Sequence, residues 1–172
     1  MLSRRRFLQV GLAGAAVLVA ARWLGRPGSA APHRTLDESH LEVIAALVPV
    51  VLAGSLPAAP AERESAIREV VEAFDRAVGG LGPAVQGEIR DLLSLLHFAP
   101  SRTALAGVGD PWREASAESV AQFLTRWRES RFDLFRAGYQ ALTQLLQAAW
   151  YGNARSWPAI GYPGPPALES GR

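Results

Sequence analysis

The chain has no cysteine among its 172 residues. This absence excludes disulfide bridges, thiolate zinc sites, iron–sulfur clusters, covalently attached haem and a lipid anchor on cysteine. The length suits one domain, and a content of 49% hydrophobic and 20% charged residues is typical of a globular chain. The fold must therefore be held by packing and hydrogen bonds alone.

Lysine is absent as well, so all 18 basic residues are arginines. Five of them lie within the first 26 residues, and from Ala31 onward 13 arginines face 16 acidic residues. This larger part has a net charge of −3 with histidine neutral, whereas a nucleic-acid-binding domain carries a basic surface. We therefore expect no nucleic-acid partner.

The N-terminal region lacks an apolar run long enough for a membrane span. Its uncharged stretch, Val10–Ala21, has twelve residues and is followed by Arg22, whereas a spanning helix needs roughly 20. A basic start, a short apolar stretch and small residues before the end are typical of a signal peptide. We expect residues 1–31 to be a leader that is cleaved after Ala30 or Ala31.

The residues before this stretch resemble the recognition sequence of the twin-arginine translocation pathway. The matching positions are Ser3, Arg4, Arg5, Phe7 and Leu8. The resemblance implies recognition by the twin-arginine translocase and export of an already folded protein to the periplasm. Two alternatives stay open: an ordinary arginine-rich signal, and an uncleaved leader that acts as a weak membrane anchor. Otherwise we expect membrane contact only during export.

From residue 32 onward the sequence predicts helices and no strands. No segment alternates apolar and polar residues over a strand's length, whereas apolar residues recur three and four apart in several long stretches. We expect an all-α fold, a small bundle of four to five helices over residues 32–151. The last stretch forms one helix or two divided near Ser130. The helical stretches are 35–52, 61–78, 83–97 and 118–151.

The first helix carries two local signals. Thr35 and Glu38 have the spacing of a capping box, which predicts that Thr35 caps the helix. Pro49 is expected to interrupt or kink the same helix near its end. The Gly- and Pro-rich residues 54–60 then predict a turn.

Residues 152–172 differ in kind, because glycine, proline and large aromatic residues follow one another there. Proline restricts them to extended and turn conformations, so we expect an extended Gly/Pro/aromatic tail. A solvated tail has little reason to carry Trp157, Ile160 and Tyr162. The tail is expected to pack either on its own bundle or on another subunit, and both alternatives stay open.

The sequence offers no catalytic constellation and no phosphate-binding loop. Gly79–Gly82 is followed by Pro83 rather than lysine, and no Gly-x-Ser-x-Gly elbow is present. Carboxylate pairs such as Glu69 and Glu72 fall on the outer side of a predicted helix, where we expect them to be solvated. We expect no catalytic residue and no cofactor in this chain.

A metal site is one hypothesis for the acidic and histidine residues near the first helix. His33, Asp37, Glu38 and His40 lie close in sequence. Their spacing lacks the two ligands four residues apart that a zinc-binding helix uses. We favour a solvated helix start and no metal.

Arg131 stands out because the periodicity places it on an apolar helix face, between Trp127 and Leu134. Either its stem packs inward while its head reaches a carboxylate, or it meets a partner at an interface. Aromatic residues are also favoured at interfaces. The candidate partner-binding residues are Arg131, Trp157, Ile160, Tyr162, Pro163 and Pro165.

The chain as a whole resembles a known family. The leader, a helical domain beginning at Leu36, the segment Trp127–Arg131 and the ending Trp150–Pro166 are together similar to subunit 3, the small subunit, of gluconate 2-dehydrogenase. The ending Gly161-Tyr162-Pro163-Gly164-Pro165-Pro166 is the most specific part of the resemblance.

The resemblance implies a non-catalytic small subunit of a flavin dehydrogenase of the glucose–methanol–choline type. In such systems the large subunit lacks a leader and holds FAD, and a cytochrome subunit is a further partner. The small subunit escorts the large one through the twin-arginine pathway and stabilises it in the periplasm. The alternative is a free-standing periplasmic helical protein that binds a ligand or an envelope component. An autonomous enzyme is a third, weaker hypothesis.

Overall fold

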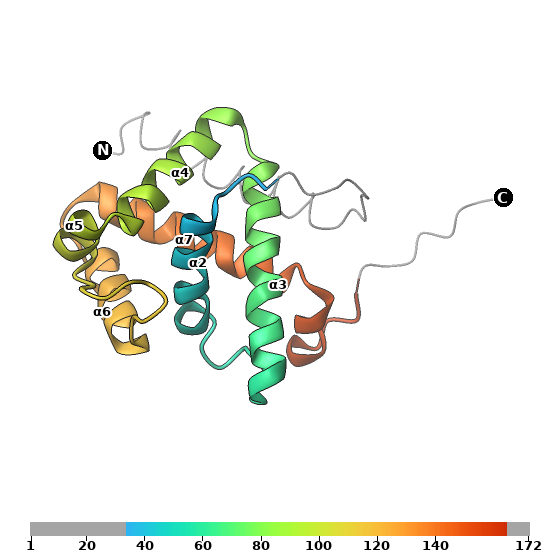
Figure 1. Ribbon diagram of the computed structural model, residues 1–172. Coiled ribbons are helices and arrows are strands. Elements are labelled where there is room, and N and C mark those ends of the chain that lie inside the picture. The colour runs from blue at the N-terminus through green and yellow to red at the C-terminus, as the bar shows by residue number, and fades with distance from the viewer. Residues whose placement is uncertain (1–33, 165–172) are drawn as a thin grey trace.

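The computed structural model describes residues 34–164, and within these it contains helices and no strand (Figure 1). Two short turns, α5 and the π-helical η1, connect α4 to α6. The expected all-α bundle is confirmed. The helices are α2 (Glu38–Val51), α3 (Pro60–Gly79), α4 (Pro83–His97), α5 (Ala99–Ser101), η1 (Arg102–Ala106), α6 (Ala117–Arg128) and α7 (Asp133–Tyr151).

Helix α2 forms the centre of the bundle. It packs against α3, α4, α6 and α7, so apolar side chains leave it in several directions rather than along one stripe. Val43, Ile44, Leu47 and Val48 are fully buried. Burying side chains of this kind contributes roughly 1.5–3 kcal/mol each, so this helix contributes substantially to core stability.

The start of α2 differs from the expected capping box. Asp37, not Thr35, caps the helix, because its carboxylate accepts the backbone N–H of His40 at 3.0 Å. The backbone N–H groups of Thr35 and Leu36 are instead bound by the buried Asp75 of α3, at 3.1 and 2.8 Å. The first residues of the described chain are thus tied to α3 rather than to their own helix.

Pro49 does not end α2, which continues to Val51. Proline has no N–H, so at this position it removes only the bond to the carbonyl four residues earlier. Because Pro49 lies in the last turn, a kink at this position would displace only the few helical residues that follow it.

The long apolar stretch 118–151 forms two helices, α6 and α7, that pack against each other. A single helix of that length would extend roughly 50 Å, far beyond the bundle that must cover it. Arg131 therefore does not lie on a helix face, as its spacing suggested. It lies exposed in the loop between α6 and α7, next to an equally exposed Leu134.

A row of aromatic rings joins the segment before α6 to α7. Trp112 meets Phe123 at a centroid distance of 5.9 Å, Phe123 meets Trp127 at 4.8 Å, and Trp127 stacks on Phe135 at 5.2 Å. Gly138 of α7 lies against the same Trp127, and a Cβ added there would come within 2.7 Å of the indole ring. The absence of a side chain at Gly138 is what allows the two helices to approach.

We expect Gly138→Ala to destabilise the protein by about 1–3 kcal/mol, because the buried indole ring has to move to admit the methyl group. Gly87→Ala in α4 is the matched control, since no atom lies within 4 Å of its added Cβ. There the better helix propensity of alanine should stabilise the protein by about 0.5–1 kcal/mol. Chemical denaturation of both variants measures the difference, and equal effects would contradict the packing argument.

Candidate functional site

Residues 153–164 are less extended than the sequence predicts. Ala154–Ser156 and Pro158–Ile160 each form one turn of 3-10 helix. The side chain of Asn153 caps the first turn by accepting the N–H of Arg155 at 3.0 Å, and Pro158 occupies the first position of the second, where no N–H is needed. Gly161 ends this turn in the left-handed region, at φ 67°. Proline therefore initiates a turn here instead of extending the chain.

Trp157 is the centre around which this tail folds. Its indole N–H donates to the carbonyl of Tyr151 at 3.1 Å, and its ring meets the Tyr162 ring edge-on at 5.4 Å. Gly164 lies so close that an added Cβ would be 3.1 Å from the indole. Trp157 thus serves the internal structure of the tail, and only part of its surface stays accessible.

The tail is fastened to the N-terminal half of α3 (Figure 1). The two oxygens of the Glu69 carboxylate receive Asn153 Nδ2 and Arg155 Nη2, each at 2.9 Å. Arg155 Nη1 also donates to the backbone carbonyl of Glu62 at 3.3 Å. The structure therefore places the described tail on its own bundle, through polar contacts. Glu69, expected to be solvated, is half-buried under this tail.

The apolar side chains of the tail face outward. Ile160 is 54% exposed, Tyr162 is 45% exposed, and Pro163 is also exposed. Tyr151 at the end of α7 is 41% exposed, and its hydroxyl lies 3.4 Å from Ser55 in the loop between α2 and α3. We call Tyr151, Ile160, Tyr162, Pro163 and the loop 55–59 the tail surface.

Arg131 is not part of the tail surface. It lies at the opposite end of α7, a helix of 19 residues that extends roughly 28 Å. Its guanidinium carbon lies 4.8 Å from the centroid of the Phe132 ring. The candidate partner-binding residues therefore fall in two separate places. The remaining predicted positions, Ser3, Arg4, Arg5, Phe7, Leu8, Ala30, Ala31 and Pro165, lie outside the described residues.

His40 is buried rather than part of a solvated helix start. Its imidazole is inserted between α2 and α4, where Nε2 lies 2.8 Å from the Ser94 hydroxyl and Nδ1 lies 3.2 Å from Asp37 Oδ1. His33 lies outside the described residues. Among residues 34–164, no group of three or more potential ligands is arranged to hold a metal ion.

Burial lowers the pKa of the His40 imidazole, and the nearby His97 and Arg90 act in the same direction. The Asp37 carboxylate opposes this effect and does not overcome it. The unfolded chain binds a proton at His40 near pH 6.5, whereas the folded chain binds it only at lower pH. The contribution of His40 to stability is therefore complete above pH 6.5 and is lost as the pH falls below that value.

We therefore expect the melting temperature to fall as the pH is lowered from 7 to 5. His40→Gln should reduce this fall, because glutamine occupies the site without titrating. Carboxylates with ordinary pKa values contribute little in this window. Differential scanning calorimetry at both pH values checks the difference, and an equal fall in the two proteins would show that His40 is not responsible.

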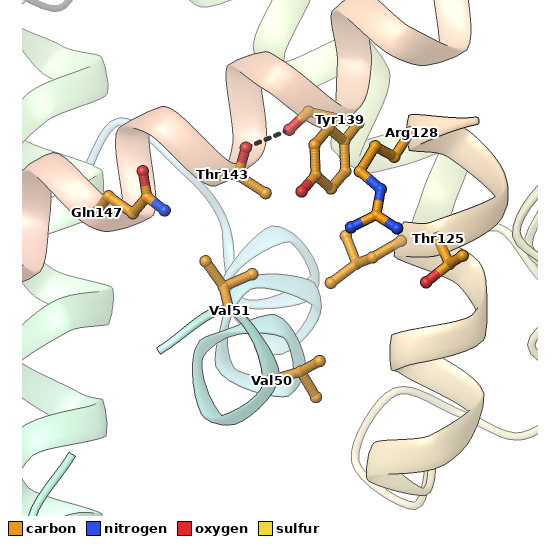
Figure 2. Close-up of a pocket in the computed structure, with 8 residues that line it drawn as sticks. Val50, Val51, Thr125, Arg128, Tyr139, Thr143 and Gln147 are labelled. Atoms are coloured by element: carbon orange, nitrogen blue, oxygen red, sulfur yellow. Dashed lines mark hydrogen bonds between the residues drawn. The ribbon is translucent and has the colours of Figure 1, made fainter. Parts of the chain in front are cut away.

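A pocket of about 160 Å³ lies where α2, α6 and α7 meet (Figure 2). Its apolar floor is formed by Val50 and Val51 from the end of α2, with Leu124 from α6. Figure 2 shows the Tyr139 hydroxyl and the Arg128 guanidinium pointing into the space above Val51. The sequence analysis did not predict this pocket, because its lining residues come from three separate helices. Its other lining residues are Thr125, Thr143 and Gln147.

Comparison of the chain with protein-family models, with curated proteins and with solved structures found no match. Within residues 34–164, none of the helices combines the length and the apolar character required to cross a bilayer. The interpretation of function therefore depends on the sequence signals and on the geometry of the tail and the pocket.

We expect Glu69→Ala to release the tail while leaving the bundle folded. Ion pairs of this exposure contribute at most about 1 kcal/mol, so the melting temperature should change by no more than a few degrees. The indole N–H of Trp157 should exchange with solvent faster, as measured by NMR. Glu72→Ala, one turn along α3 and exposed, is the control; unchanged exchange in the Glu69 variant would contradict this role.

Proposed function

We propose that this chain is the non-catalytic small subunit of a flavin dehydrogenase. It escorts a leaderless, FAD-containing large subunit of the glucose–methanol–choline type through the twin-arginine pathway and stabilises it in the periplasm. The leader residues Arg4 and Arg5 engage the translocase, and the tail surface holds the flavoprotein. FAD belongs to the partner, and a cytochrome subunit completes the complex.

The geometry of the tail is the observation that supports this proposal best. A tail that only completed its own core would bury its apolar side chains. Here the polar residues Asn153 and Arg155 hold the tail to α3 and Trp157 packs within the tail, while Ile160 and much of Tyr162 are left exposed. Exposed tyrosine and aliphatic side chains on a fixed turn are typical of binding hot spots. The same two residues belong to the C-terminal ending whose sequence resembles the small-subunit family.

The proposal is tested by purifying the full chain with a C-terminal tag from the periplasm of its native host. A stoichiometric partner with a flavin absorption spectrum is expected, identified by mass spectrometry. Replacing both Ile160 and Tyr162 by alanine should lower the recovered flavoprotein about tenfold or more, because each hot-spot residue contributes over 1 kcal/mol. Leu134→Ala is the control, since Leu134 is 77% exposed at the other end of α7.

Replacing Arg4 and Arg5 by lysine in the same host should keep both proteins in the cytoplasm. A colourless chain without a partner would overturn the escort function. It would support the alternative of a free-standing periplasmic helical protein that binds a ligand or an envelope component. Equal recovery from the Leu134 variant and the Ile160/Tyr162 variant would place the partner elsewhere on the bundle.

A further inference from the structure

Helix α7 connects the pocket to the tail surface. Tyr139, Thr143, Gln147 and Tyr151 are spaced four residues apart, so they form one stripe that winds gradually around the helix and includes the buried Thr143. The first three line the pocket, and Tyr151 belongs to the tail surface. The stripe extends roughly 18 Å, which a short segment of a bound partner can follow.

The polar groups of the pocket are one donor-only group, the Arg128 guanidinium, and hydroxyl and amide groups that both donate and accept. The Arg128 guanidinium, the Tyr139 hydroxyl and the Gln147 side-chain amide all lie around the opening (Figure 2). The Thr143 hydroxyl is already engaged, because it donates to the carbonyl of Tyr139 at 2.7 Å. A guanidinium beside a phenol hydroxyl is complementary to a carboxylate, which accepts several hydrogen bonds at once.

Arg128 remains available to such a ligand. Its present carboxylate partner is its neighbour Glu129, at 2.8 Å, and both side chains are more than half exposed. Exposed pairs of this kind are worth little, and arginine has five donors. The guanidinium can therefore bind a second carboxylate without losing a buried contact. The pKa of Arg128 is raised, first by Glu129 and to a smaller extent by Tyr139.

We propose that this pocket receives the carboxylate side chain of an aspartate or glutamate on the partner segment that follows the α7 stripe. This inference rests on the proposed function, since the segment belongs to the escorted flavoprotein. The carboxylate binds Arg128 and Tyr139, and its methylene groups contact Val50 and Val51. Helix α7 lines the pocket and ends at Tyr151 of the tail surface, which favours a residue of that same partner over a separate small ligand.

The pocket is tested first without any partner, by NMR titration of the full chain. The probe is N-acetyl-glutamate N-methylamide, and the matched probe is the corresponding glutamine compound, which has the same shape and no charge. The glutamate compound should shift the Arg128 Nε–H and Gln147 amide signals saturably, with a dissociation constant on the order of 10 mM. Arg128→Gln should abolish the response of Gln147. No saturable shift, or equal shifts with both probes, would overturn the proposal.

The second test uses the complex with the flavoprotein. Arg128→Gln should weaken binding about tenfold, as expected for the loss of one charge-assisted contact. Arg76→Gln, on the exposed side of α3, should leave binding within about twofold, in line with isolated surface charges. Unchanged binding of the Arg128 variant would overturn the pocket assignment and leave the escort function standing. If no complex forms, the escort function fails and the titration alone decides whether the pocket takes carboxylates.

Discussion

The rest of the structure depends on the packing of four helices around α2. The side chains of α2 that face these neighbours lose contact with water, so each polar group among them needs a partner nearby. His40 meets this need at Nε2, which lies 2.8 Å from the Ser94 hydroxyl, whereas its buried Nδ1 makes no hydrogen bond with any described residue, although Asp37 Oδ1 lies 3.2 Å away. The same constraint extends to the chain just before α2, where the buried Asp75 binds two backbone N–H groups that no helix could satisfy. The path of the chain into the bundle is therefore determined by α3.

The tail illustrates a division of roles between polar and apolar side chains. Glu69 holds Asn153 and Arg155, and Trp157 organises the turn that follows. The apolar residues that remain are presented at the surface, next to the end of α7. In most folds apolar groups face the core and polar groups face water. The reversal at this corner of the molecule is the structural basis for regarding it as a contact region, and the pocket between α2, α6 and α7 extends that region.

The sequence predicted the helices well, because their apolar residues recur at helical spacing and several begin at proline or end next to glycine. It was less informative where partners are distant in the chain. Glu69 looked like a solvated surface residue because Asn153 is 84 positions away. Arg131 was assigned to an apolar face because the periodicity of α6 continues into α7 and conceals the break at residue 130. Thr35 matched a capping box, yet Asp37 has the better geometry. The turns of the tail were missed because proline suits both extended and turn conformations.

The central place of α2 also has a consequence for the order of folding. Its contacts with α3 and α4 are local in sequence, whereas those with α6 and α7 join segments about eighty or more residues apart. A nascent chain can form the first three long helices early. The apolar side chains of α2 that contact α6 and α7 are then exposed to water and prone to associate with other chains. The bundle closes only when α6 and α7 pack on α2, and we expect this closure, which joins segments far apart in the chain, to be the slow step of folding. A partly synthesised chain is thus the form most exposed to aggregation.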